Sequence, residues 1–245
     1  MASTSETGHA KNVANFEDLI SFCTGYGATY NPSKAAIKIA ALTTLQTNAQ
    51  SSIGSVTTSK VAFTNATNAW QAAFDPLKKL STKIVNALDA TDATDKLVKD
   101  AKSINNKIQG KRSGDKPTPP PAGVTDAAED KTISVSQQSY DSLIENFDKL
   151  IQLVSSEPTY TPNETDLQVS TLTTTLGNLK TTNTGVINAY TNYSNARITR
   201  NTILYGATSG LVEIAGDVKK YVKSVFGATS PQFKQVSKLE FKKVK

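Results

Sequence analysis

The sequence predicts an all-α protein: an elongated helical bundle of two tandem homologous units, each with one long helix flanked by shorter helices. Three observations indicate this fold. Apolar residues recur at helical spacing over two long stretches, the second half repeats the first, and a proline-rich segment lies between them. The expected division is residues 1–109 for the first repeat, 110–133 for the linker, and 134–245 for the second repeat with its basic C-terminal tail.

The second half of the chain repeats the first at a nearly constant offset. Short motifs recur 131 and then 130 positions later, after which the match continues without a gap. Internal repetition of this kind indicates a duplicated structural unit. The matching segments are Asn15–Ile20 with Asn146–Ile151, Thr29–Pro32 with Thr159–Pro162, Leu42–Thr44 with Leu172–Thr174, and Phe63 with Tyr193.

The first long helix is expected from about Ser33 to about Leu88, after a shorter helix from about Lys11 to Thr24. Apolar residues alternate by three and four positions along the long stretch, as in a coiled coil. Pro76 interrupts it, and we expect a kink or break within 72–75, because proline lacks a backbone donor and crowds the carbonyl four residues earlier. Ser33 directly follows a proline and is the expected N-cap.

The second long helix is expected to follow Asn163, its candidate N-cap, and to continue to about Val225. A shorter helix at about 136–155 precedes it. Threonine is frequent in residues 172–184, and this composition would also suit a strand. The spacing by three and four has no matching strict alternation, so a helix is predicted.

Each half ends in a further short amphipathic element. In the first half, apolar residues recur at helical spacing over 97–108. In the second half they follow Pro231, and their spacing over 239–244 leaves a helix and an extended tail both open. Between the halves, residues 116–123 are rich in proline and predict an exposed loop with polyproline character.

Positive charge is concentrated at the C-terminal end of the chain. The 245 residues carry a net charge of +6, and segment 216–245 alone has eight lysines against two acids, which also gives +6. Lysines without arginine or interleaved aromatic residues are a weak signal for nucleic-acid binding. No nucleic-acid partner is therefore expected, and a solvated amphipathic end is the simpler interpretation.

The N-terminal residues lack the charged and apolar regions of a secretory signal. Cys23 is the single cysteine, which excludes an internal disulfide. No apolar stretch approaches the roughly 20 residues that a membrane-spanning helix needs. The sequence predicts a cytoplasmic protein and leaves open export by a route that uses no N-terminal signal.

Residue types that usually carry catalysis are scarce. His9 is the only histidine and lies in a polar N-terminal segment, and Cys23 falls on the apolar face of a predicted helix, where an inert thiol is expected. One histidine and one cysteine cannot form a Cys/His metal site, and no Glu-x-x-His metal motif occurs. The sequence therefore predicts no catalytic residue, no metal site, no cofactor and no enzyme activity.

Aromatic and arginine side chains on the predicted seams are the candidate interface residues, because aromatic residues at such positions usually pack in a core or an interface. Polar seam residues cost stability but can fix register or partner choice. A buried guanidinium needs an oxygen partner, so the two arginines are expected either to be exposed or to pair with acids. The interface candidates are Trp70, Tyr190, Tyr193, Arg197, Arg200 and Tyr221. The expected acidic partners are Asp141, Glu145, Asp148 and Glu157.

Three segments of the chain carry a resemblance to a known family: Thr4–Phe16 (TSETGHAKNVANF), Ser134–Tyr140 (SVSQQSY) and Val222–Pro231 (VKSVFGATSP). They resemble those of an uncharacterised, internally duplicated family of small helical bacterial proteins. The likeness runs nearly from end to end. The resemblance implies a helical fold and carries over no activity, ligand or functional residue.

The leading hypothesis is a non-enzymatic structural or interaction protein that self-assembles, because long apolar seams and a duplicated unit offer surfaces that pair within and between chains. Its expected partner is a second copy or another protein. The alternative is a membrane-active helical protein, similar in outline to α-helical pore-forming toxins. Such proteins hide an apolar hairpin, whereas this chain offers only a lysine-rich segment with Val222, Val225 and Phe226, which suits binding to a membrane surface.

Overall fold

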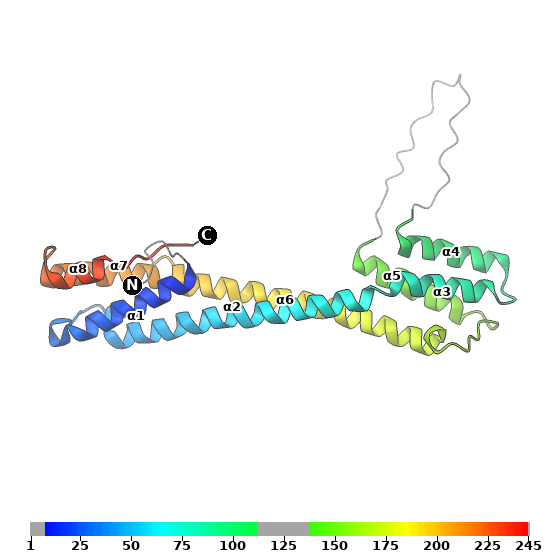
Figure 1. The fold of residues 1–245 in the computed structure, drawn as a ribbon, viewed down its shortest axis with the longest axis horizontal. Coiled ribbons are helices and arrows are strands. Elements are labelled where there is room, and N and C mark those ends of the chain that lie inside the picture. Colours follow the sequence, from blue (N-terminus) through cyan, green and yellow to red (C-terminus); the bar gives the residue numbers. More distant parts are fainter. Residues whose placement is uncertain (1–7, 112–137, 245) are drawn as a thin grey trace, which may run out of the picture. The chain divides into compact units, whose positions relative to one another are not determined.

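The computed structural model describes residues 8–111 and 138–244, and in these ranges every regular element is a helix (Figure 1). The all-α class predicted from the sequence is confirmed. The α-helices are α1 (His9–Gly25), α2 (Ile39–Phe74), α3 (Leu77–Asp89), α4 (Asp95–Gln109), α5 (Tyr140–Ser155), α6 (Val169–Tyr205), α7 (Leu211–Phe226) and α8 (Pro231–Ser237). The 3-10 turns are η1 (Gly27–Thr29), η2 (Ala35–Ile37) and η3 (Thr165–Leu167).

The chain forms two compact units, and each unit takes segments from both halves of the sequence. Unit 1 comprises Met1–Thr64 and Ala189–Lys245, and unit 2 comprises Asn65–Asn188. The compact units therefore do not coincide with the predicted repeats at 1–109 and 134–245. Most of the predicted linker at 110–133 lies outside the described residues.

Unit 1 contains α1, the first part of α2, the last part of α6, α7 and α8. Helix α1 packs against both α7 and α8. The burial of apolar side chains between these helices is the main stabilising contribution to the unit. Its fully buried side chains include Phe16, Leu19, Leu42, Leu204, Leu211, Val218 and Val222.

Unit 2 contains the end of α2, α3, α4, α5 and the first part of α6. Helix α4 packs against both α3 and α5. Its core is formed in the same way, by the apolar faces of amphipathic helices. The fully buried side chains include Ile84, Leu88, Ala101, Ile108, Phe147, Leu150 and Leu172.

A tyrosine turn precedes each long helix. The buried Tyr30 hydroxyl donates to the carbonyl of Ile37 at 2.6 Å, and the buried Tyr160 hydroxyl donates to the carbonyl of Leu167 at 3.0 Å. Each bond spans seven residues and closes over a 3-10 turn, η2 or η3. Two segments at the same position in the sequence repeat thus share one local structure.

The tyrosine turns also correct the predicted helix starts. Helix α2 begins at Ile39 and α6 at Val169, so Ser33 and Asn163 are not their N-caps. In each case a 3-10 turn whose last residue is buried replaces the first predicted helical turn. Burying that residue and satisfying its carbonyl outweighs the capping preference of a serine or asparagine.

The break predicted at Pro76 is confirmed, since α2 ends at Phe74 and α3 begins at Leu77. The uninterrupted second helix predicted to about Val225 is wrong, because α6 ends at Tyr205 and α7 begins at Leu211.

Two glycines explain the second break. A Cβ on Gly206 would lie 2.7 Å from the Thr202 carbonyl oxygen, and one on Gly210 would lie 2.6 Å from the Gly206 carbonyl oxygen. Only glycine allows the backbone to approach this closely. Gly206 lies 130 residues after Pro76, the offset of the sequence repeat.

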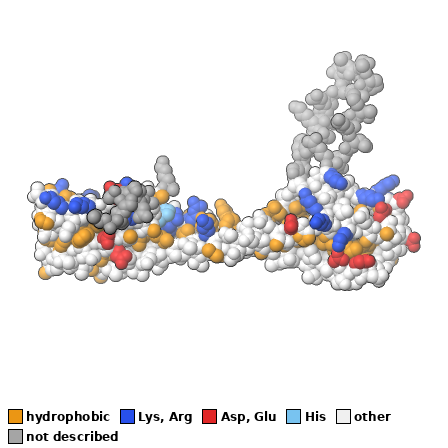
Figure 2. All heavy atoms as spheres, in the orientation of Figure 1, with side chains coloured by type: hydrophobic (Ala, Val, Ile, Leu, Met, Phe, Trp, Pro, Cys, Tyr) orange, Lys and Arg blue, Asp and Glu red, His pale blue; other side chains and the backbone are white. Residues whose placement is uncertain are grey.

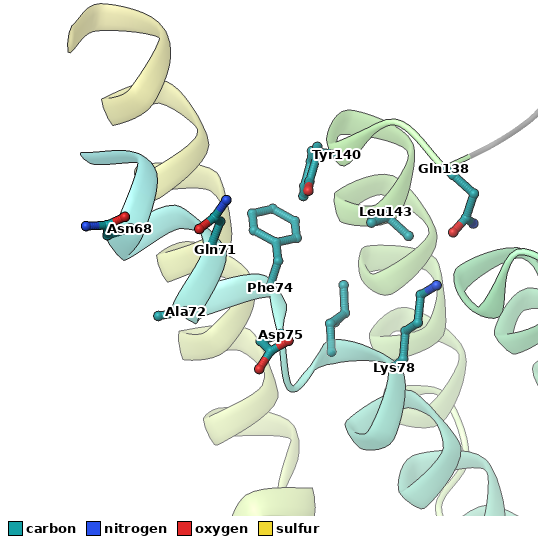
Figure 3. A pocket seen from close by; sticks show the side chains of 10 residues that line it. Asn68, Gln71, Ala72, Phe74, Asp75, Lys78, Gln138, Tyr140 and Leu143 are labelled. Atoms are coloured by element: carbon teal, nitrogen blue, oxygen red, sulfur yellow. The ribbon is translucent and has the colours of Figure 1, made fainter. Parts of the chain in front are cut away.

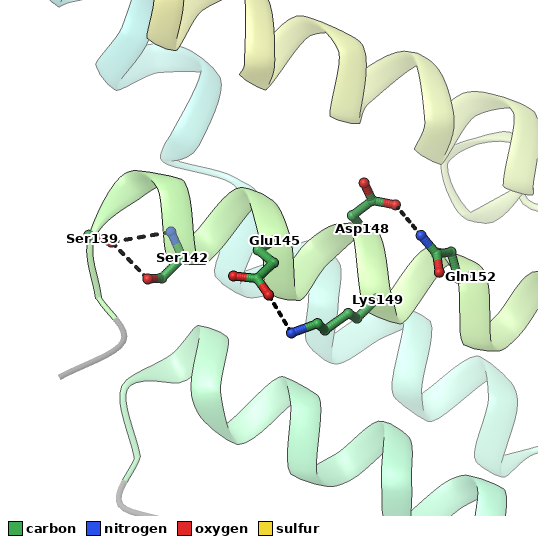
Figure 4. Close-up of polar contacts among 6 residues, drawn as sticks. All are labelled: Ser139, Ser142, Glu145, Asp148, Lys149 and Gln152. Atoms are coloured by element: carbon green, nitrogen blue, oxygen red, sulfur yellow. Dashed lines mark hydrogen bonds and ion pairs between the residues drawn. The ribbon is translucent and has the colours of Figure 1, made fainter. Parts of the chain in front are cut away.

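The shorter helices follow their predicted ranges, with local polar contacts at their ends and faces. Ser139 caps α5 by accepting from the Ser142 amide at 3.2 Å, and Lys149 pairs with Glu145 at 2.6 Å (Figure 4). Predicted residues 136 and 137 of this helix lie outside the described range. The predicted element at 97–108 lies within α4.

For residues 239–244, where a helix and an extended tail were both left open, the structure shows the non-helical tail, which follows a short helix. Residues 231–237 form α8, which Ser230 caps by accepting from the Phe233 amide at 3.1 Å. Residues 238–244, called the tail below, are not helical.

Candidate functional site

Three of the interface candidates in unit 1, Tyr190, Tyr193 and Arg197, lie on α6 around contacts with Phe63 of α2. The Phe63 ring stacks on Tyr193 with centroids 6.1 Å apart and contacts Tyr190 at 5.5 Å. The Arg197 guanidinium carbon lies 5.6 Å from the centre of the Tyr193 ring, a cation–π geometry. The structure therefore brings three of the predicted residues together.

Three apolar side chains of α2 and α6 in unit 1 are exposed. Val61 is 56% exposed, Tyr190 is 57% exposed and Ile198 is 61% exposed. We call these three residues the apolar set of unit 1. Tyr190 and Ile198 are eight residues apart on α6, which places them within about 80° of each other around the helix. The predicted seam is thus buried at Leu204 but exposed at Tyr190.

The two arginines are held without carboxylates among the described residues. Arg197 is exposed, and Arg200 donates to the side-chain oxygen of Asn201 at 2.8 and 3.1 Å. Arg197 is therefore exposed, one of the two outcomes expected for the arginines. Pairing with an acid of the same chain is not found among the described residues, where Glu145 and Asp148 pair with lysines of unit 2. Pairing with an acid of a neighbouring chain, the other form of this expectation, stays a prediction.

Trp70 belongs to an aromatic cluster beside a cavity of unit 2. Its ring lies 3.7 Å from Tyr140 between centroids, and Tyr140 packs edge-on against Phe74 at 4.9 Å. The indole nitrogen of Trp70 donates to Asn183, which itself donates to Asp141 at 2.8 Å. The Asn183 side chain thus accepts one hydrogen bond and donates another within unit 2.

The adjoining cavity has a volume of about 710 Å³ and opens where α2 ends and α3 begins (Figure 3). Phe74, Tyr140 and Leu143 form its apolar wall, and Asp75 and Lys78 supply its charges. This mixture offers stacking and ion-pairing contacts. It offers no histidine or cysteine for acid–base or nucleophilic chemistry.

A second cavity of about 600 Å³ in unit 2 lies beside the tyrosine turn of Tyr160. Lys83 and Asp166 pair across it at 2.9 Å. Burial and the charges of Asp166 and Glu164 raise the pKa of Tyr160 to about 12. The phenol therefore stays protonated and serves as the donor of the turn.

Tyr221 has a structural role in unit 1. Its ring meets Tyr30 edge-on at 5.3 Å, and its hydroxyl accepts from the Asn31 amide at 3.2 Å. The side chain is half-buried. Like Trp70, it therefore contacts residues of its own unit.

The single histidine and the single cysteine lie in unit 1 and do not meet. The His9 Nδ1 lies 2.7 Å from the Tyr205 hydroxyl, and burial, with a smaller contribution from the Arg200 charge, lowers the pKa of the imidazole. Burial raises the pKa of the Cys23 thiol to about 12. A thiol with such a pKa is inert, as the sequence predicted.

One polar site, where two asparagines of α1 bind the tail, was not predicted from the sequence. The Asn12 side chain donates to the Lys242 carbonyl at 2.7 Å and accepts from the Lys242 amide at 3.0 Å. The Asn15 side chain donates to the Glu240 carbonyl at 2.7 Å. The detectable signal was two asparagines on the otherwise apolar face of a short helix.

The residues considered for binding to a membrane surface lie in α7. Val222, part of the segment considered for membrane binding, is fully buried, and Phe226 packs on Tyr26 at 5.1 Å. Among residues 8–111 and 138–244, no helix combines the length and apolar character needed to cross a membrane. The same ranges hold no group of three histidine, cysteine or acidic side chains placed to bind a metal ion.

The chain matches no protein-family model, no curated protein and no solved structure. The resemblance to a bacterial helical family therefore stays a prediction, and any functional argument rests on the chain's own residues.

Proposed function

We propose that this protein is a non-enzymatic structural protein that self-assembles through unit 1. The observation that carries the proposal is the apolar set, in which each side chain is more than half exposed. Water-exposed apolar side chains that cluster on a small protein surface are typical of interaction sites. A second copy of the chain is the proposed partner.

The neighbouring side chains suit such a contact. Phe63 contacts Tyr190 of the apolar set and stacks on Tyr193, over whose ring Arg197 lies. Tyrosine and arginine are enriched at the centres of protein interfaces. The arginine is not paired with a carboxylate among the described residues, so it has donors left for a partner's carboxylate or carbonyl. Two copies related by a twofold axis would place the same residues on both sides of one interface.

The proposal includes an internal duplication of the chain. The matched tyrosine turns support it, because both join a short helix to a long one by the same hydrogen bond at the same repeat position. Matched burial at Phe16 and Phe147, and at Ile84 and Ile214, supports it further. The tandem, coiled-coil-like arrangement inferred from the sequence remains part of the proposal.

Particle mass measured by light scattering across a range of concentrations tests self-assembly. We expect the wild-type mass to exceed that of one chain at high concentration. The double substitution Tyr190→Gln with Ile198→Gln is expected to lower the mass, because it removes exposed apolar surface while glutamine keeps a good helix propensity.

A matched control replaces two exposed polar residues of the same helix, Asn195→Gln with Thr199→Gln. This control is expected to leave the mass unchanged. A wild-type chain that stays monomeric at the highest concentration overturns the proposal, and so does an equal loss of mass in both double variants.

A further inference from the structure

The tail crosses unit 1 as an extended segment with an alternating pattern of burial. Leu239 and Phe241 are half-buried and pack against the core of the unit, whereas Glu240 and Lys242 are exposed. Alternation with a period of two is the pattern of an extended chain that lies on a surface. The tail therefore contacts unit 1 as an extended peptide would.

The asparagines on α1 bind the tail through its backbone. Asn12 uses its donor and its acceptor on one residue, Lys242, and Asn15 binds the carbonyl of Glu240, two residues earlier. One face of a helix thus pairs with every second residue of an extended segment. Contacts of this kind fix the path of the segment and its register.

Side-chain contacts favour a bound segment with the sequence pattern of the tail, in which apolar residues alternate with polar ones and lysine is frequent. The Phe241 ring meets Phe16 edge-on at 6.4 Å, and the Lys219 ammonium lies 5.2 Å from the same ring. Lys219 also donates to the Leu239 carbonyl, and Lys243 pairs with Glu213 at 3.0 Å. We call this surface of α1 and α7 the tail site, defined by Asn12, Asn15, Phe16, Glu213 and Lys219.

The tail has no regular secondary structure of its own. The tail is held by ring contacts and by side-chain hydrogen bonds to its backbone, and it belongs to no helix, so it can leave without unfolding another element. Exchange of such an identical segment between copies creates the same contacts in a new pairing, with little change in energy per contact.

We propose that the tail site is an exchange site, at which residues 238–244 of a second copy replace the chain's own tail. The inference rests on the proposed self-assembly and names the segment that a partner copy contributes. The tail of the same chain competes at an effective concentration on the order of 1 mM, as expected for a segment joined by a short connection. Exchange is therefore concentration-dependent and weak.

Photocrosslinking of the full chain tests the exchange. A benzophenone amino acid replaces Phe241, and the products are separated under denaturing conditions. We expect crosslinks within one chain at low concentration and covalent dimers that increase as the concentration approaches about 1 mM. The same group at Val225, an exposed residue of α7, is the control and should give few dimers.

Peptide binding is the second test. In the full chain with Leu239→Ser and Phe241→Ser, the tail loses its apolar contacts and the site opens to a labelled peptide with the sequence of residues 237–244. We expect binding of this peptide, and a loss of affinity of at least about 10-fold when Asn12→Ala and Asn15→Ala are added, since three hydrogen bonds are removed. A peptide of the same composition in scrambled order is the control.

The outcomes separate the two proposals. Absence of covalent dimers at every concentration overturns the exchange, as does failure of the peptide to bind a variant whose helicity is retained. If the serine variant fails to fold, the crosslinking result decides alone. A chain that oligomerises in light scattering but forms no covalent dimers keeps the proposed self-assembly and loses the exchange.

Discussion

Units 1 and 2 share a tyrosine turn but differ in charge. Over unit 1, 14 basic and 6 acidic residues give a net charge of +8, and over unit 2, 13 basic and 15 acidic residues give −2. On the face shown in Figure 2, Lys and Arg side chains follow the α7 and α8 side of unit 1, whereas in unit 2 they stand among Asp and Glu. A shared local structure therefore does not imply a shared partner.

The units also differ in what covers the short helix that precedes the tyrosine turn, α1 in unit 1 and α5 in unit 2. In unit 2, α5 is covered by α4, a helix of 15 residues held at its N-terminus by a Thr94 cap. In unit 1, α1 is covered in part by the non-helical tail. Under the proposed exchange, unit 1 is therefore the unit that contributes and receives a tail.

The largest expected effects come from a matched pair of core substitutions, Phe16→Ala and Phe147→Ala. Both rings are fully buried, and each loss should lower the free energy of unfolding by about 3–5 kcal/mol. Phe16→Ala should also make Cys23 reactive to a thiol reagent at neutral pH, because it loosens the core around that residue. Phe147→Ala should leave the thiol protected, and equal reactivity in both variants would show that the units unfold together.

A smaller effect is expected from Tyr30→Phe and Tyr160→Phe. Each removes one buried hydrogen bond and leaves a carbonyl without its donor, which costs about 1–3 kcal/mol. Urea denaturation of the two variants measures the difference. Losses of similar size agree with a duplicated turn, and a loss confined to one variant would contradict it.

The smallest effect concerns pH and unit 1 alone. Because burial lowers the pKa of His9 in the folded state, the unfolded chain binds a proton more readily, and stability should fall as the pH drops below about 6.5. His9→Gln should flatten this part of the stability curve measured by thermal melting. An unchanged slope in the variant would assign the pH dependence to other groups.

Much of the fold could be predicted from the sequence because its causes are local. Pro76 breaks the first long helix by its own chemistry, and the apolar spacing of α1 and α4 marks them as helices. The break at Gly206 was missed although a glycine pair marked it, since the apolar seam continues past it in register.

The make-up of the units could not be predicted, because periodicity identifies which face of a helix is buried but not which helix covers it. Tyr190, for example, has the spacing of a seam residue but is more than half exposed, which periodicity alone could not reveal. The tail site could not be predicted either, because Asn12 and Asn15 bind backbone atoms more than 220 residues away in the chain.

Hydrogen exchange of the full chain, read by mass spectrometry at low and high protein concentration, tests most directly whether unit 1 is the assembling unit. We predict that backbone amides in residues 189–204 and 239–244 exchange more slowly at high concentration, while those of α3, α4 and α5 do not change. Exchange rates that are independent of concentration, or protection gained only in unit 2, would contradict the account.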